Sequence, residues 1–171
     1  MFVSIFDLFK IGIGPSSSHT MGPMVAAERF LARFKKENIT TECHLKVTFY
    51  GSLAFTGKGH ASDRAVMLGL LGHKPNALDP DKVDGYIDNL MTTKAIIKSG
   101  YPKLLFNPDS DLIFDYGPAL KAHPNGMIFQ AFHDDTEILK RTYYSIGGGF
   151  VLSAEELEQM HNQKVEDFDF P

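Results

Sequence analysis

The hydrophobic pattern of the chain changes its period after the first forty residues. From Pro23 onward, apolar side chains recur at spacings of three and four, which predicts an amphipathic helix that runs to about Lys36 and stops at Asn38. Pro23 suits the first turn of this helix, where its missing N–H is no loss. Beyond residue 43, apolar and polar residues alternate, which predicts a half-buried strand. Its apolar positions are Leu45, Val47 and Phe49.

Similar patterns predict the remaining elements. Helices are expected over residues 6–10, 60–71 and 79–98, with Gly72 as a left-handed cap and a small-residue loop over residues 51–59. Strands are expected over 104–106, 112–114, 127–132 and 139–146, with a turn at Asp134 and Asp135 between the last two. Ser153 and Glu156 have the spacing of a capping box, which predicts a final helix over Ala154–Met160.

Helices early in the chain and strands late in the chain indicate an α+β fold rather than an alternating α/β fold. We expect a two-layer sandwich in which a mixed, mostly antiparallel sheet carries its helices on one face. Residues 1–161 are expected to form one domain, which is an ordinary length for a single core. Residues 162–171 are expected to be a tail, or the start of a linker, without an element of their own.

Composition excludes several classes of function. The net charge is −4 and the sequence contains no basic stripe, which argues against nucleic acid as the main partner. A single cysteine, Cys43, cannot supply the several ligands of a zinc or iron–sulfur site, and its apolar surroundings predict an inert buried thiol. No apolar run approaches the roughly 18 residues of a membrane span, and the N-terminus does not resemble a signal peptide. We therefore expect a cytoplasmic protein without a membrane partner.

The first candidate site is the segment from Gly12 to Thr20. Glycines and Pro15 are followed by four hydroxyl side chains and an imidazole, directly before a predicted helix. Free N–H groups at a helix start favour anions, so these side chains are suited to hold a carboxylate or a phosphate. In the alternative interpretation, one hydroxyl caps the helix and the others are solvated. The density of polar residues favours binding, and the candidates are Ser16, Ser17, Ser18, His19 and Thr20.

The second candidate runs from Gly51 to His60. Lys58 lies between two glycines and can pair with an anion, but the order of a phosphate-binding loop fails because Gly59 stands where its hydroxyl residue should be. Histidine titrates near neutral pH, so His60 is a candidate general base. Alternatively, His60 is a polar residue of a first helical turn with Asp63 as its local partner. The spacing alone leaves both interpretations open.

Two weaker segments follow. His123-Pro124-Asn125-Gly126 is typical of a turn whatever its function. Residues 147–149 are three consecutive glycines next to a predicted strand, which suits a bulge or the close approach of a ligand.

Together and in this order, the four segments resemble the beta domain of the iron–sulfur L-serine dehydratases. The resemblance rests on FDLFKIGIGPSSSHTMGPM, YGSLAFTGKGHASDRA, HPNGM and YYSIGGGF, and it spans the chain from Val3 to Ser153. It implies a fold like the allosteric substrate-binding domain of some D-3-phosphoglycerate dehydrogenases. It also implies a 4Fe-4S cluster that acts on the serine β-hydroxyl and is held by cysteines of a separate alpha domain or subunit, not by this chain.

The resemblance further implies the conversion of L-serine to pyruvate and ammonia, in serine catabolism and gluconeogenesis. His60 becomes the candidate base for the α-proton. The substrate would be held by Ser16, Ser17, Ser18, His19 and Thr20, with Lys58, His123 and Asn125 nearby. The expected partners are L-serine and the cluster-binding domain, in a full enzyme that forms a homodimer, and the chain alone is expected to be inactive.

Two alternatives remain open. The chain could be a non-catalytic module that senses serine, in which case serine binding would not need His60. A pyridoxal-phosphate enzyme would perform the same net reaction through a lysine Schiff base. That function is disfavoured, because Lys58 is the only lysine in a suitable glycine context and no phosphate-binding loop accompanies it.

Overall fold

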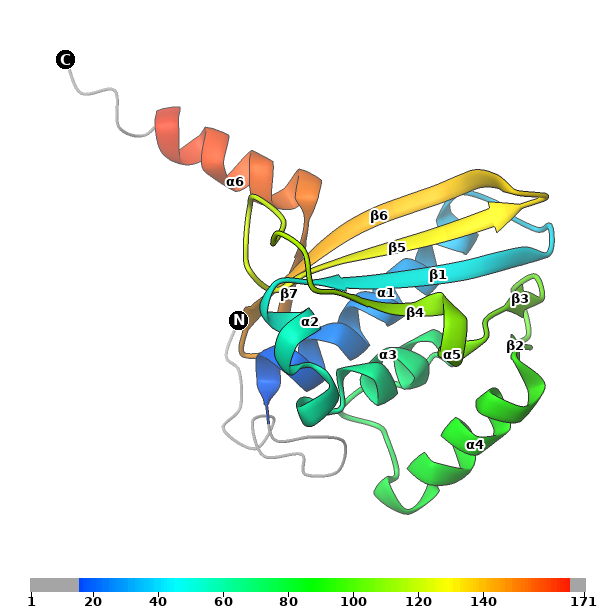
Figure 1. Ribbon diagram of the computed structural model, residues 1–171. Helices are drawn as coiled ribbons and strands as arrows, with labels where there is room; N and C mark the ends of the chain where they lie inside the picture. The colour runs from blue at the N-terminus through cyan, green and yellow to red at the C-terminus, as the bar shows by residue number, and fades with distance from the viewer. Residues whose placement is uncertain (1–15, 167–171) are drawn as a thin grey trace.

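A sheet of seven strands forms the centre of the protein (Figure 1). The computed structural model describes residues 16–166, with side chains through residue 162. The expected helix over residues 6–10 and the first glycines of the Gly12–Thr20 segment therefore lie outside the described residues. The strands are β1 (Cys43–Tyr50), β2 (Ala95–Ile96), β3 (Leu104–Leu105), β4 (Leu112–Asp115), β5 (Gly126–His133), β6 (Thr136–Gly147) and β7 (Phe150–Ser153).

The sheet is mixed and mostly antiparallel, as predicted. Its order is β2-β3-β1-β5-β6-β7, with β4 paired to β1 beyond the stretch that pairs with β3. β1 runs parallel to β3 and β4, whereas the β1–β5, β5–β6, β6–β7 and β2–β3 pairs are antiparallel. The long β5–β6 hairpin turns at Asp134 and Asp135, both with positive φ, which confirms the predicted turn.

The principal helices lie on one side of this sheet, so the predicted α+β class is confirmed (Figure 1). The helices are α1 (Gly22–Lys36), α2 (Ser52–Thr56), α3 (Ser62–Leu70), α4 (Val83–Thr93), α5 (Pro108–Asp111) and α6 (Ala154–Glu166). Helix α1 packs against the sheet through Phe30, whose ring centroid is 5.3 Å from that of Phe129 and 5.7 Å from that of Phe34. Helix α3 packs on α1, and α4 packs on α3.

Several predicted boundaries were wrong. The helix expected over 79–98 ends at Thr93, because Lys94 adopts a left-handed conformation (φ 51°) and the next residues pair as β2 with β3. The helix expected from residue 60 begins at Ser62, because Ala61 is left-handed (φ 57°) and residues 58–60 form a 3-10 turn. The expected loop over 51–59 contains the one-turn helix α2.

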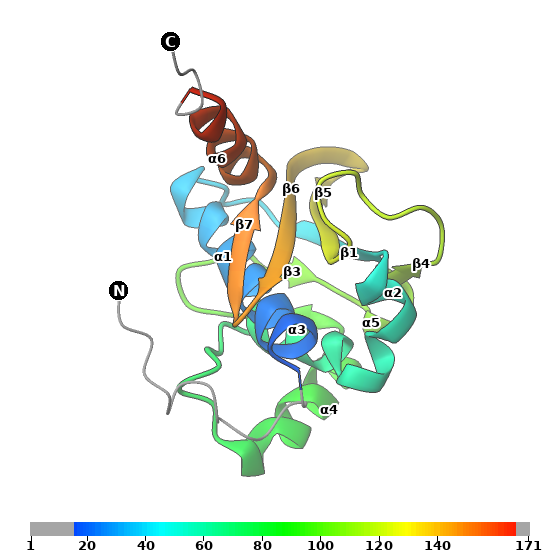
Figure 2. The same cartoon turned by 90° about the vertical axis from the view of Figure 1, so that its left-hand side faces the viewer.

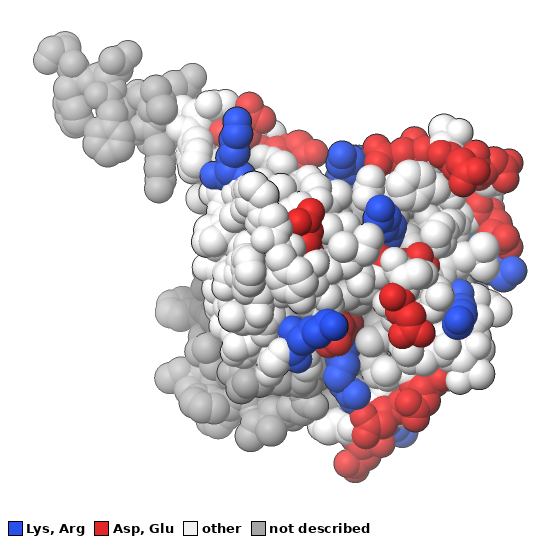
Figure 3. All heavy atoms as spheres, in the orientation of Figure 1, with Lys and Arg blue, Asp and Glu red and all other residues white. Residues whose placement is uncertain are grey.

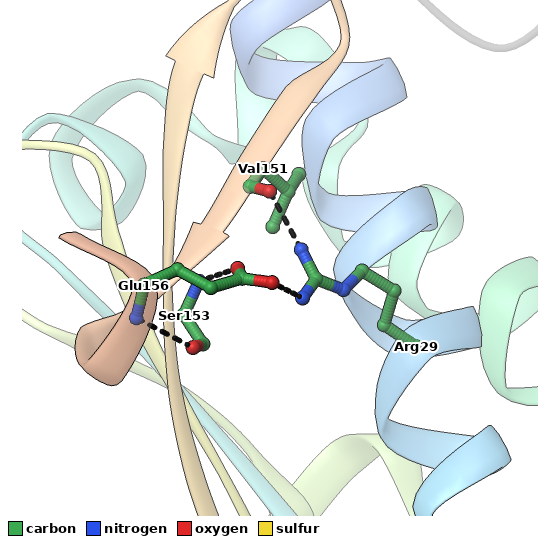
Figure 4. A network of polar contacts seen from close by, with 4 residues as sticks. All are labelled: Arg29, Val151, Ser153 and Glu156. Carbon is green, nitrogen blue, oxygen red and sulfur yellow. Dashed lines mark hydrogen bonds and ion pairs between the residues drawn. The ribbon is translucent and has the colours of Figure 1, made fainter. Parts of the chain in front are cut away.

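The C-terminal helix is longer than predicted and is tied to the rest of the fold by a polar network (Figure 4). The capping box is confirmed, because Glu156 N donates to Ser153 Oγ and Ser153 N donates to Glu156 Oε2. From α1, Arg29 donates to the Val151 carbonyl at 2.6 Å and to Glu156 Oε1 at 2.7 Å. Helix α6 continues to Glu166, so the expectation that residues from 162 onward have no element was wrong through residue 166.

Surface charge and the lengths of the helices are relevant to the predicted absence of nucleic-acid and membrane partners. On the face shown in Figure 3, lysine and arginine side chains are dispersed among aspartate and glutamate. Among residues 16–166, no helix is both long enough and apolar enough to cross a membrane. The cytoplasmic location stays a prediction.

Removal of the Phe30 ring tests the packing between α1 and the sheet. Phe30 is 1% exposed, and we expect Phe30→Ala to lower the free energy of unfolding by about 3–5 kcal/mol, through lost burial and a residual cavity. Urea unfolding measures the change. Ile97→Ala is the control, because Ile97 is 82% exposed. Equal losses in the two variants would contradict this view of the core.

Candidate functional site

The four predicted segments meet at one end of the sheet, the end that faces the viewer in Figure 2. Ser145, near the end of β6, donates from its hydroxyl to the Ser18 carbonyl at 2.7 Å. Its backbone N–H donates to the Asn125 carbonyl at 3.0 Å. Just after β1, the Ser52 N–H donates to the Pro124 carbonyl at 2.9 Å. Residues 16–20, 51–60, 123–126 and 145–149 are thus connected by direct hydrogen bonds.

Two glycines permit this close approach. Gly51, between β1 and α2, has φ 55°, and a Cβ there would lie 2.4 Å from the Pro124 carbonyl oxygen. Gly22, at the start of α1, lies against β6, where a Cβ would come within 1.9 Å of Ser145 Oγ. A side chain at either position would separate the segments that form the site.

Two histidines from different segments lie together at this end. The ring centroids of His19 and His60 are 5.0 Å apart, and the rings are tilted by 42°. Their backbones are joined too, because Thr20 Oγ1 donates to the His60 carbonyl at 2.8 Å and the Ser62 hydroxyl donates to the His19 carbonyl. The short helical turn Ser17–Met21 presents His19, and the 3-10 turn Lys58–His60 presents His60.

The ring of His19 has hydroxyl partners on both nitrogens. Nδ1 lies 2.8 Å from Ser18 Oγ, and Nε2 lies 3.0 Å from Ser52 Oγ. Burial lowers the pKa of His19 below its usual value, and the neighbouring His60 lowers this pKa further. A lowered pKa favours the neutral imidazole of His19 near pH 7.

His60 has a different hydrogen-bonding arrangement. Its Nδ1 lies 2.9 Å from the Thr56 carbonyl oxygen, which can only accept a hydrogen bond, so Nδ1 carries the proton. In the neutral ring the lone pair is therefore on Nε2, which has no partner within the described part of the chain. The hydrogen-bond partner of the His60 ring is Thr56 and not the expected Asp63, whose Oδ1 accepts from the Arg64 N–H.

The turn before β5 contributes a donor. The Asn125 N–H donates to Nδ1 of His123 at 3.1 Å, so neutral His123 carries its proton on Nε2. Asn125 Nδ2 donates to the Ser145 carbonyl at 3.1 Å, which connects this turn to the segment that holds Ser18. His60 and His123 thus have opposite tautomers: the first offers a lone pair and the second an N–H.

The predicted residues differ in how closely they are brought together. Ser16 and Ser18 both lie at Nδ1 of His19, with Ser16 Oγ 3.3 Å from Ser18 Oγ. Ser17 Oγ accepts from the Gly148 N–H at 3.2 Å, which brings the glycine triplet to the site. The ammonium of Lys58 is 5.3 Å from the centre of the Phe114 ring, and Lys58 and Asp63 line a hollow of about 250 Å³ whose lining includes neither His19 nor His60.

The sequence interpretation missed Ser52, Ser62 and Ser145, whose hydroxyls hold the site together. All three are inside two of the quoted motifs, but nothing in their local pattern separates them from other serines. Their partners are between 33 and 127 residues away along the chain, so only the fold identifies them.

The described residues do not form a site for an iron–sulfur cluster. Among residues 16–166, no group of three or more His, Cys, Asp and Glu residues is arranged to hold a metal. Cys43, the only cysteine of the sequence, is 1% exposed and lies in β1. Burial raises the pKa of its thiol, which disfavours the thiolate form that binds metals. The predicted inert, buried thiol agrees with this environment.

Comparison with known proteins identifies the family. Residues 4–156 match the family model of the serine dehydratase beta chain. This chain belongs to the serine dehydratase beta chain family. The match covers all four motifs that carried the resemblance.

Relatives of this beta chain are longer proteins. The chain is 44% identical over 155 residues to the L-serine dehydratase of Haemophilus influenzae, which covers 88% of the chain and 33% of the relative. It is 42% identical over 154 residues to the L-serine dehydratase of Streptomyces coelicolor, with 89% and 34% covered. For L-serine dehydratase 1 of Escherichia coli, the identity is 40% over 159 residues, with 92% and 35% covered. The chain thus spans about a third of the length of these relatives.

A methyl group at Gly51 tests how the site is assembled. We expect Gly51→Ala to lower the free energy of unfolding by about 1–3 kcal/mol or more, because the added methyl group overpacks the contact with Pro124 at a residue that has a positive φ. It should also broaden the NMR signals of the His19 and His60 rings. Gly59→Ala is the matched control in the same segment, since a Cβ there meets no atom within 4 Å. Similar losses in both variants would contradict the contact with Pro124.

Proposed function

We propose that this beta chain is the substrate-binding half of an L-serine dehydratase, which converts L-serine to pyruvate and ammonia. The proposal is supported by the family and by relatives that are named L-serine dehydratases. The observation that carries it is the pair of histidines with unequal hydrogen bonding at the meeting point of the four motifs. Loss of water from serine needs a base for the α-proton, and a histidine with an open lone pair suits that task.

His60 is the proposed base. Its Nδ1 proton is engaged by the Thr56 carbonyl, which leaves Nε2 to accept the α-proton as the Cα–H bond breaks. The hydrogen bond to Thr56 also fixes the orientation of the ring. It stabilises the imidazolium that forms, because a charged donor makes a stronger hydrogen bond than a neutral one.

The serine carboxylate and amino group would be held by the surrounding donors and acceptors. His123 offers an Nε2–H, which is suited to a carboxylate oxygen. Hydroxyl groups of Ser16, Ser17 and Ser18 can donate to a carboxylate or accept from an ammonium group. Thr20 is 2% exposed and its hydroxyl is engaged by the His60 carbonyl, so Thr20 acts here by fixing the backbone of His60 rather than by holding substrate.

The rest of the catalytic apparatus would come from the part of the relatives that this chain does not span. The 4Fe-4S cluster implied by the resemblance needs several cysteines, and this sequence has one. Exposed apolar side chains near the site are suited to contact such a domain. Phe55 (64% exposed) packs against Tyr116 (58%) with ring centroids 5.3 Å apart and a tilt of 57°, and Ile146 and Phe150 flank the glycine triplet. The homodimer remains a prediction of the resemblance.

Replacement of His60 in the complete enzyme, this chain together with the part that its relatives add, tests the assignment. We expect His60→Gln to lower kcat by about a hundredfold or more, which is typical for loss of a general base, with little change in serine binding. Steady-state kinetics and equilibrium dialysis with labelled serine measure the two effects. The control is His161→Gln, because His161 is exposed on α6.

The outcomes separate the two candidate functions. Turnover within about tenfold of the unchanged enzyme would remove His60 from the role of base, since a general base contributes more than that. Serine binding by the chain without any turnover in the complete enzyme would instead support a serine-sensing module.

A further inference from the structure

The one-turn helix α2 contacts both histidines of the site. Its first residue, Ser52, places its hydroxyl 3.0 Å from His19 Nε2. Its last residue, Thr56, places its carbonyl oxygen 2.9 Å from His60 Nδ1. The two ends of the helix are joined, because Thr56 Oγ1 donates to the Ser52 carbonyl at 2.8 Å. The length of a single helical turn therefore sets the spacing between the groups that hold the two rings.

Ser52 is itself held in place by the backbone around it. Its N–H donates to the Pro124 carbonyl, and the preceding Gly51 lies in a conformation that brings Pro124 too close for any side chain. The hydroxyl of Ser52 thus has a defined position relative to the turn that carries His123 and Asn125. This position comes from the fold, since Ser52 and His19 are 33 residues apart in the sequence.

The two rings differ because their partners differ. A carbonyl oxygen can only accept, so it dictates one tautomer of His60. A hydroxyl can either donate or accept, so the hydroxyls at the two nitrogens of His19 must divide these roles: a hydroxyl accepts at the protonated nitrogen, and a hydroxyl donates at the bare nitrogen. With both in place, the lone pair and the proton of neutral His19 are both engaged. Only Ser52 reaches Nε2 among the described residues.

We propose that Ser52 is a positioning residue of this site, whose hydroxyl holds the His19 ring in one tautomer beside His60, while the Thr56 carbonyl leaves His60 Nε2 as the lone pair that faces substrate. The first half of this statement concerns the chain alone. The second half rests on the proposed function, since it gives the free lone pair a task. Ser52 acts through His19 in this account and needs no contact with the reacting atoms.

NMR of the histidine ring nitrogens in the 171-residue chain tests the proposal directly. Long-range nitrogen–proton spectra above the pKa of both rings report which nitrogen carries the proton. We expect one dominant tautomer for His19 in the unchanged chain and a ratio of tautomers at least about fivefold different in Ser52→Ala, as the loss of one ordinary hydrogen bond produces. His60 should keep its proton on Nδ1 in both.

Three further variants make the result specific. Ser52→Thr restores a hydroxyl and should keep the His19 ratio within about twofold of the unchanged chain. Ser52→Cys fills the same space with a weak hydrogen-bonding group, so it should behave like Ser52→Ala even if that variant folds poorly. Ser110→Ala removes an exposed serine hydroxyl from α5 and should change neither ring.

An unchanged His19 ratio in both Ser52→Ala and Ser52→Cys would overturn the proposal. A change of the same size in the His19 tautomer ratio of Ser110→Ala would also overturn it, because the ratio would then not depend specifically on the Ser52 hydroxyl. These readouts do not depend on turnover. If the serine dehydratase assignment fails, the complete enzyme will not turn over L-serine, but the spectra of the Ser52 variants will still change as expected. If the Ser52 role fails, the His19 tautomer ratio will stay the same in those variants whatever the activity.

Discussion

Hydrogen bonds between backbone groups at one end of the sheet are the constraint on which the site depends. The Ser52 N–H lies just after β1, and the Ser145 N–H lies in β6 just beyond the stretch that pairs with β5. They are satisfied by carbonyls of the turn before β5, at Pro124 and Asn125. Because unpaired buried backbone groups are costly, these bonds are obligatory for the fold. They bring together loops that are far apart in the sequence, and the side chains of those loops then share one location.

This arrangement gives two chemically identical side chains different properties. His60 is held by a carbonyl and keeps an open Nε2, whereas both nitrogens of His19 are occupied by hydroxyls. The low pKa of His19, caused by burial and by its neighbour, keeps the pair from carrying two positive charges at close range. A base and a neutral neighbour at 5.0 Å are the division of roles on which the proposed proton removal rests.

Much of the fold could be predicted because its periodic patterns are strong. The helix with buried Phe30 and Phe34 and the strand with buried Val47 and Phe49 were found where apolar spacing placed them. Boundaries that depend on a left-handed residue were missed, since Ala61 and Lys94 give no local signal for positive φ. For Lys94 the conformation leads into the pairing of β2 with β3, and its carbonyl accepts from the Phe106 N–H.

The site was predictable in its segments but not in its contacts. Dense hydroxyls and glycines marked the loops, and the convergence of residues 16–20 with His60 is present in the structure. The importance of Ser52 and the position of Lys58 at a hollow that neither histidine lines depend on side-chain directions that the sequence does not encode locally. The likeness to the substrate-binding domain of D-3-phosphoglycerate dehydrogenase stays a prediction.

The electrostatic coupling of His19 to His60 gives the most direct measurement of the central claim, that the two rings share one site. An NMR titration of His19 should show that its pKa rises in His60→Gln, because a neighbouring charge that disfavours the imidazolium has been removed, while burial still keeps the pKa below its usual value. A replacement of the exposed His161 should leave it unchanged. A pKa of His19 that stays constant, or falls, when His60 is removed would contradict the account.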